Sequence, residues 1–294
     1  MIADAHVHAW RVWPYAADVP DPATRGSAET LLYELDRHGI GRALVVAARI
    51  GHEVGPAQAN DDANDYVAAA VARHPDRLAA AVDVDSRWSP EHHRPGAADR
   101  LTAAVDRYGA PVVTHYLGAG DDGWLDSPGG REFAAAAVQA RVALSLAAGP
   151  AWYPSLDRLA AAFPTLPIML HHLGGLVLDR PGFAADRAAL LALARHPGVV
   201  VKVSGFHYAE SPSHAYPYAR ARAEILAPLR DAFGADRLAW GSDFPVCRPH
   251  LSYRQAVATV ADHTPSWTVR ERALVLGGTL DRLLRTTADR PAPT

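Results

Sequence analysis

Eight short apolar segments alternate with longer stretches of helical periodicity along the whole chain. The segments are Ile2–Val7, Arg42–Ala48, Leu78–Val84, Pro111–Tyr116, Val142–Ala147, Pro167–Leu173, Val199–Phe206 and Leu238–Phe244. Several are continuously apolar, which is typical of strands buried on both faces of a parallel sheet. This alternation constrains the fold more than any other feature, because it requires strand–helix units that repeat to the end of the chain.

Helices are predicted between and after these segments. They cover about Ala28–His38, Asp61–His74, Ala97–Tyr108, Arg131–Ala140, Ser155–Phe163, Ala184–His196, Tyr216–Phe233, Tyr253–Asp262 and Val269–Arg285. The links from helix to strand are short, whereas several links from strand to helix are long. Eight such units predict an α/β fold, a single (β/α)8 TIM barrel, whose active site lies at the carboxyl ends of the strands. A doubly wound open sheet is the alternative architecture.

The barrel is predicted to occupy residues 1–285 as one domain, followed by a loose tail over residues 286–294. A net charge of -3 provides no basic field for nucleic acid. No segment approaches the roughly 18 uninterrupted apolar residues that would span a membrane, and the first residues do not resemble a secretory leader. We therefore expect a cytoplasmic protein with a small-molecule substrate, and whether it forms a homodimer is left open. The single cysteine, Cys247, excludes an internal disulfide framework.

Ionisable residues gather at the carboxyl ends of the predicted strands. His6 and His8 are two positions apart on the first strand, so both side chains can point into the barrel mouth. The sixth segment includes His171 and His172, of which strand alternation allows only one inward, and the eighth includes Asp243. Several such groups at one end of a barrel are more than packing requires, and they indicate a catalytic or metal site.

Lys202 lies in the seventh segment and is the only lysine among 29 basic residues. A compact ammonium and a planar guanidinium are not interchangeable, so this position favours a point charge. Lys202 would hold a substrate carboxylate or stabilise developing negative charge. The alternatives are an ion pair with an aspartate of a neighbouring strand, such as Asp83, or drift in an arginine-rich composition.

Four further residues are expected to contact the substrate. Arg49 follows the second segment, Trp88 lies in the third loop, His115 lies at the end of the fourth segment, and His207 lies in the seventh loop. Aromatic side chains in long loops at this face suit the wall of an apolar pocket. They could equally well pack the loops against the barrel.

These strand-end motifs resemble the amidohydrolase superfamily, in its amidohydrolase-2 branch of predicted metal-dependent TIM-barrel hydrolases, which includes sugar lactonases and pyrone-dicarboxylate lactonase. The resemblance covers nearly the whole chain and rests on Asp4-Ala5-His6-Val7-His8, His172-Leu173-Gly174, Lys202-Val203-Ser204-Gly205, Trp240-Gly241-Ser242-Asp243-Phe244-Pro245 and Leu276-Gly277-Gly278-Thr279.

The resemblance implies that His6, His8, His172 and Asp243 bind one divalent metal ion, usually zinc, and that Asp243 activates the attacking water. Zinc with an open position lowers the pKa of bound water to about 7 and polarises the carbonyl under attack. Some lactonases of this branch work without metal, in which case the histidines would polarise the substrate and the aspartate would still act as base. The sequence leaves both mechanisms open, and we expect the metal.

We therefore expect an enzyme, a hydrolase that opens a small lactone of sugar-acid or aromatic-catabolic type, with Asp243, His172 and Lys202 as catalytic residues. The fourth segment contains no lysine that could bridge a second metal. His115 stands where related proteins often have an arginine, which puts a dicarboxylate substrate in doubt. Two alternatives remain: a decarboxylase of a small unsaturated or aromatic carboxylic acid on the same barrel, and a non-catalytic ligand-binding barrel.

Overall fold

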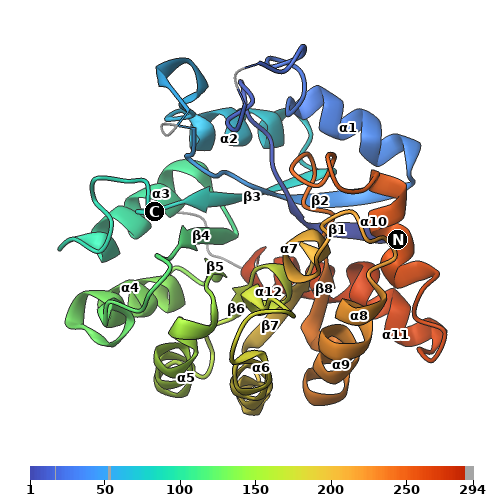
Figure 1. Cartoon of the computed structure of the whole chain (residues 1–294). Coiled ribbons are helices and arrows are strands. Elements are labelled where there is room, and N and C mark those ends of the chain that lie inside the picture. The colour runs from blue at the N-terminus through green and yellow to red at the C-terminus, as the bar shows by residue number, and fades with distance from the viewer. Residues whose placement is uncertain (17, 52–53, 289–294) are drawn as a thin grey trace.

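The predicted strands are all present in this computed structural model, and each pairs in parallel with the next along the chain (Figure 1). The structure describes residues 1–16, 18–51 and 54–288. The strands are β1 (Ile2–Val7), β2 (Ile40–Val46), β3 (Leu78–Asp83), β4 (Val112–Tyr116), β5 (Ala143–Ala147), β6 (Ile168–Leu170), β7 (Val199–Val203) and β8 (Leu238–Trp240). Strand order follows sequence order, so the chain forms a nearly closed (β/α)8 barrel, as predicted.

The barrel closes where β1 meets the segment that follows β8. Val7 forms a parallel bridge with Phe244. The backbone N–H of His8 donates to the carbonyl of Phe244 at 2.7 Å, and the N–H of Asp243 donates to the carbonyl of His6 at 2.8 Å. The backbone that closes the barrel therefore also carries two predicted histidines and the predicted aspartate.

Helices surround the strands (Figure 1). They are α1 (Ala28–Arg37), α2 (Ala63–Arg73), α3 (Ala97–Tyr108), α4 (Pro128–Gln139), α5 (Tyr153–Ala162), α6 (Phe183–Ala192), α7 (Phe206–Ala209), α8 (Ala219–Ala221), α9 (Ala227–Phe233), α10 (Tyr253–Ala261), α11 (Val269–Ala273) and α12 (Thr279–Ala288). Short helical turns complete them: η1 (Pro56–Gln58), η2 (Trp124–Asp126), η3 (Pro150–Trp152), η4 (His172–Gly175), η5 (Leu193–Arg195), η6 (Arg222–Leu226), η7 (Ala235–Arg237) and η8 (Leu274–Gly278).

The two longest predicted helices are both irregular: the first contains a π-helical turn, η6, and the second is kinked in η8, at Gly277, whose φ of 172° is extended. At η8 the helix passes the start of β1, and a Cβ on Gly277 would lie 2.6 Å from the carbonyl oxygen of Met1. This close approach requires glycine and explains why the periodic pattern is interrupted there. The last helix continues to Ala288, three residues past the predicted boundary at 285. The rest of the predicted tail, 289–294, lies outside the described residues.

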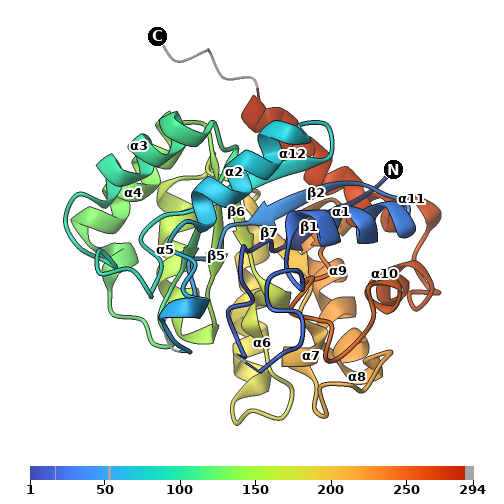
Figure 2. The same ribbon diagram turned by 90° about the horizontal axis from the view of Figure 1, so that it is seen from above.

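The core has two parts. One lies between the strands and the surrounding helices, and the other fills the barrel near the N-terminal ends of the strands. Leu280, Leu283 and Leu284 of α12 pack against this inner cluster, so α12 covers that end of the barrel (Figure 2). The other end, where α7 and α8 lie, is left for the polar residues (Figure 2). In the described part of the chain, no helix combines the length and the apolar character needed to cross a bilayer.

Candidate active site

His6, His8 and Asp243 form the centre of the barrel mouth. The Nε2 atoms of His6 and His8 are 3.3 Å apart. The Oδ1 atom of Asp243 lies 3.6 Å from Nε2 of His6 and 3.5 Å from Nε2 of His8. All three side chains are buried. Three donor atoms at this mutual spacing suit one metal ion, since tetrahedral zinc with bonds of about 2.0–2.1 Å separates its ligand atoms by about 3.3 Å.

Hydrogen bonds orient this donor set from outside. His8 donates from Nδ1 to the carbonyl of Val46 at 2.9 Å, which leaves its Nε2 lone pair free, and its ring stacks on Trp10 with centroids 4.7 Å apart. The Oδ1 atom of Asp243 is buried with no hydrogen-bond partner among the described residues. An orphaned carboxylate oxygen is costly in a protein interior, and a bound cation would satisfy it. The donor set therefore fits a divalent ion.

His171 and His172 both turn toward His6, with ring centroids 4.5 Å from the His6 ring in each case. Strand alternation allowed only one of the pair inward, and this expectation is wrong because the chain has already left β6 at this point. His172 has a left-handed backbone, with φ of 47°, which redirects its side chain. Its Nδ1 bonds Ser204 Oγ at 3.0 Å, and its Nε2 lies 4.0 Å from Asp243 Oδ1.

Lys202 lies beneath the mouth and is completely buried. Its Nζ donates to Ser145 Oγ at 2.7 Å and lies 3.1 Å from Nδ1 of His6. Burial lowers the pKa of Lys202 to about 7. Asp83 is not its partner, because the carboxylate of Asp83 accepts from the backbone N–H groups of Arg49 and Ser86. Lys202 therefore supports a histidine of the centre and does not line the cavity.

The second oxygen of Asp243 faces the α7 segment. Tyr208 donates its hydroxyl to Oδ2 at 3.0 Å, and Nε2 of His207 lies 3.5 Å from the same oxygen. Burial raises the pKa of Asp243, but the neighbouring His172, His8 and His207 outweigh it and lower the pKa below the usual value. Burial also lowers the pKa values of His172 and His207 to about 4. At neutral pH the site therefore pairs an ionised carboxylate with neutral imidazoles.

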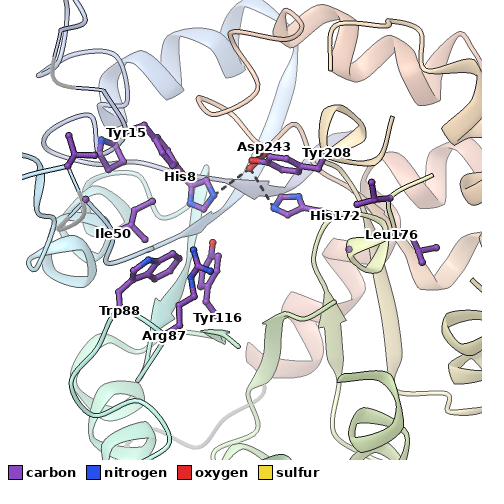
Figure 3. A pocket seen from close by; sticks show the side chains of 15 residues that line it. His8, Tyr15, Ile50, Arg87, Trp88, Tyr116, His172, Leu176, Tyr208 and Asp243 are labelled. Carbon is purple, nitrogen blue, oxygen red and sulfur yellow. Dashed lines mark hydrogen bonds and ion pairs between the residues drawn. The ribbon is translucent and has the colours of Figure 1, made fainter. Parts of the chain in front are cut away.

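A cavity of about 380 Å³ opens above this centre (Figure 3). Its lining comprises His8, Pro14, Tyr15, Ile50, Gly51, Val54, Arg87, Trp88, Tyr116, His172, Gly175, Leu176, Val177, Tyr208 and Asp243. Trp88 lies in the wall as predicted, with its ring 4.9 Å from that of Tyr116, and the guanidinium of Arg87 lies 4.6 Å over the Trp88 ring. The predictions missed Arg87, which lies in the long loop after the third expected strand, and Tyr116, which is the last residue of the fourth expected strand.

Three residues predicted to bind substrate lie outside the cavity lining. His115 points away from the mouth, toward the helices, where its ring lies 5.1 Å from Trp124 and 5.5 Å from Phe133, so we withdraw its predicted contact with substrate. Arg49 has its guanidinium 3.8 Å from Asp61, although the next residue, Ile50, lines the cavity. His207 contacts Asp243 from behind and stacks on His250, with centroids 4.5 Å apart.

Comparisons with known proteins agree with this architecture. A family model described as amidohydrolase matches residues 3–285. Among curated proteins, L-fucono-1,5-lactonase of Burkholderia ambifaria is 33% identical over 133 residues, which are 44% of this chain and 43% of that protein. The chain therefore spans less than half the length of the curated relatives that it matches.

Two solved structures share the fold across 97% of this chain. An amidohydrolase from Burkholderia multivorans with bound zinc has a TM-score of 0.74 at 23% identity, over 99% of its chain. The 2,6-dihydroxybenzoate decarboxylase from Rhizobium has a TM-score of 0.64 at 17% identity, over 98% of its chain. At these identities the likeness concerns the fold alone.

Proposed function

From the premise that the chain belongs to the amidohydrolase family, we propose that it is a hydrolase that opens a small lactone. The observation that carries this proposal is the buried carboxylate of Asp243, one oxygen of which has no hydrogen-bond partner among the described residues and faces the imidazoles of His6 and His8. An ionised, rigidly held carboxylate at the floor of a cavity is suited to accept a proton from water. The lactonase relative supports a cyclic ester as the substrate class.

The reaction requires little movement of the protein. Asp243 takes a proton from a water molecule while the water oxygen attacks the lactone carbonyl carbon. The bond between that carbon and the ring oxygen then breaks, and Asp243 returns the proton to the departing oxygen, which yields an open-chain hydroxy acid. Tyr208, which donates to Oδ2 of Asp243, holds the carboxylate in one orientation during both transfers.

The residues that would hold a divalent ion are His6, His8 and Asp243, with His172 beside them. Such an ion, which we propose to be zinc because imidazole and carboxylate ligands suit it, polarises a carbonyl and lowers the pKa of bound water. Lys202 and the carbonyl of Val46 position the imidazoles of His6 and His8 from behind. The Val46 carbonyl, which can only accept, fixes both the ring orientation and the tautomer of His8, while Lys202 holds the orientation of the His6 ring.

The cavity favours a small ring that carries hydroxyl groups. Its volume of about 380 Å³ suits a ligand of one ring with short substituents. Trp88 and Tyr116 offer aromatic faces to the C–H side of such a ring, and Arg87 offers hydrogen-bond donors to its oxygens. We therefore propose a sugar-acid lactone, with Arg87 and Trp88 as substrate-binding residues.

The proposal is tested with Asp243→Asn on a panel of sugar and aromatic lactones, by following hydroxy-acid release. Loss of a general base typically lowers the rate 10²-fold or more, while the near-isosteric amide preserves the shape of the site. We expect at least this loss with an unchanged circular dichroism spectrum. Retention of more than about a tenth of the wild-type rate would contradict the role of Asp243.

A decarboxylase remains the alternative, because proteins with that activity share the fold. The two reactions differ in their products: a decarboxylase releases carbon dioxide without consuming water. Carbon dioxide release from small aromatic acids by the wild-type protein, with every lactone left intact, would replace the proposed function by this one. Ligand binding without turnover of either substrate class would indicate a non-catalytic barrel.

A further inference from the structure

A second group of histidines lies between the strand wall and the helices, apart from the cavity. His92 and His93 belong to the loop between β3 and α3, and His115 belongs to β4. One ring nitrogen from each of the three lies within 4.8 Å of the other two. His115 is completely buried, and the side chain of His93 is 8% exposed. None of these residues lines the cavity or contacts the residues assigned to catalysis above.

Each of the three rings is oriented by a group that can only accept a hydrogen bond. Nδ1 of His92 bonds the carbonyl of Asp85 at 2.8 Å, and Nδ1 of His115 bonds the carbonyl of Val84 at 2.8 Å. Nδ1 of His93 bonds the carboxylate of Asp122 at 2.6 Å. Because a carbonyl or carboxylate oxygen cannot donate, each Nδ1 carries the hydrogen, and each neutral ring is left with a bare Nε2 lone pair.

Two of these lone pairs face each other. Nε2 of His93 lies 3.2 Å from Nε2 of His115. Such an approach is repulsive unless a cation lies between or beside the two nitrogens. Tetrahedral zinc separates its imidazole nitrogens by about 3.3 Å, as bonds of about 2.0–2.1 Å require. The spacing is close to the 3.3 Å between His6 and His8 at the first centre.

The surroundings favour a metal ion over a shared proton. A shared proton would make an imidazolium of one ring, and a charged ring is costly beside His115, which is completely buried. A proton also joins only two nitrogens, whereas a ring nitrogen of a third imidazole, that of His92, lies within 4.8 Å of a ring nitrogen of each of the other two. Nδ1 bonds to carbonyls and a carboxylate are typical of metal-binding histidines.

We propose that His92, His93 and His115 bind one divalent transition-metal ion, Zn²⁺, at a site separate from the barrel mouth. Asp122 orients His93 through its Nδ1, and Trp124, stacked on the His93 ring with centroids 4.3 Å apart, covers the site. Three nitrogen ligands leave one position for water. The ion would join the β3–α3 loop to β4, so its role is structural, and the proposal does not depend on the reaction proposed above.

The experiment measures zinc per chain after the chelated full-length protein is reloaded with excess Zn²⁺ and passed through a desalting column. The double variant His6→Gln with Asp243→Asn disables the mouth, because His6 belongs to both groups of possible ligands there, His6–His8–Asp243 and His6–His171–His172. His93→Gln removes one ligand of the second site. His74→Gln, outside both groups, is the matched control. Circular dichroism confirms the fold of each variant, and cobalt(II) absorption reports tetrahedral nitrogen coordination independently of activity.

We expect the double variant to keep about one zinc per chain, to show the cobalt(II) spectrum and to gain thermal stability when zinc is added. Adding His93→Gln should abolish all three, whereas adding His74→Gln should change none. A double variant that binds no zinc, or binding that survives His93→Gln, would overturn the proposal and indicate a proton shared by His93 and His115. Zinc on the second site with no lactone hydrolysis by the wild-type protein would leave this proposal standing and overturn only the proposed reaction.

Discussion

The role of Lys202 could be predicted only in part from the sequence. Its solitary occurrence predicted a position that requires an ammonium, and the structure places that ammonium against His6 and Ser145, in full burial. The expected contact with substrate does not follow, because the side chain lies one layer below the cavity. A lysine in this place acts through the imidazole that it contacts, and we therefore regard it as a positioning residue.

Replacing Lys202 by methionine should separate this role from a structural one. We expect kcat on the lactone substrate to fall about 10- to 100-fold, because hydrogen bonds to charged groups contribute about 1.5–3 kcal/mol. KM should change little, since Lys202 does not line the cavity. The melting temperature should stay close to that of the wild type, because an apolar isostere relieves the burial of a charge. Lys202→Arg should not restore kcat, and a fully active Lys202→Met would contradict the positioning role.

Other site residues differ in how well the sequence predicts them. His6, His8 and Asp243 lie where a strand ends, so period-2 geometry and strand order suffice to bring them together. Strand alternation does not predict the positions of His171 and His172, because the left-handed backbone at His172 redirects its side chain. Arg87 lies in a loop with no periodic pattern, and only the folded path of that loop brings it over Trp88.

Among the elements, the contact between β1 and the segment that follows β8 constrains the geometry of the candidate site most. The barrel closes through backbone hydrogen bonds that His6 and His8 share with Asp243 and Phe244. Gly241, just after β8, permits this approach, because a Cβ there would lie 2.6 Å from Cβ of His6. Packing at the end of one strand therefore determines the position of a proposed catalytic histidine on the other.

Gly241→Ala should consequently impair stability and activity together. Overpacking typically costs about 1–3 kcal/mol, which corresponds to a fall in melting temperature of several degrees for a chain of this size. We expect activity to fall about 10-fold or more, because small displacements of reacting groups are costly. Gly149→Ala is the matched control, since nothing lies within 4 Å of its Cβ position. Equal melting temperatures for the two variants would show that the segment after β8 adapts freely.

The prediction of elements succeeded where the pattern is local and failed where a distant segment intervenes. The helix expected over Ala97–Tyr108 begins and ends at those residues in the structure. The stretch Val269–Arg285 is instead kinked at Gly277, where the chain passes close to Met1. His115 lies on the expected strand, but its helix-facing side became evident only from the register of β4 in the closed sheet.

At the scale of the whole molecule, buried carboxylates make stability depend on pH. Asp83 lies inside the barrel, and burial raises its pKa to about 6 from the model-peptide value of 3.8. The folded state therefore binds this proton more tightly than the unfolded state. The stability that Asp83 contributes is fully present below about pH 4 and is lost as the pH rises through about 6.

Denaturant unfolding of the wild type and of Asp83→Asn, at pH 4 and at pH 8, measures this effect. A pKa difference of about two units corresponds to roughly 2–3 kcal/mol. The difference in unfolding free energy between asparagine variant and wild type should therefore shift by about that amount in favour of the variant at pH 8. A difference independent of pH would contradict the raised pKa.

Because the barrel closes between residues from its two ends, the residues of the candidate site are synthesised at different times. His6 and His8 leave the ribosome first, while Asp243, which lies 3.5 Å from His8 in the folded protein, follows 235 residues later. At about 5–20 residues per second this interval is on the order of 10–50 s. During that time neither histidine can contact Asp243, so the proposed metal-binding residues come together only late in synthesis.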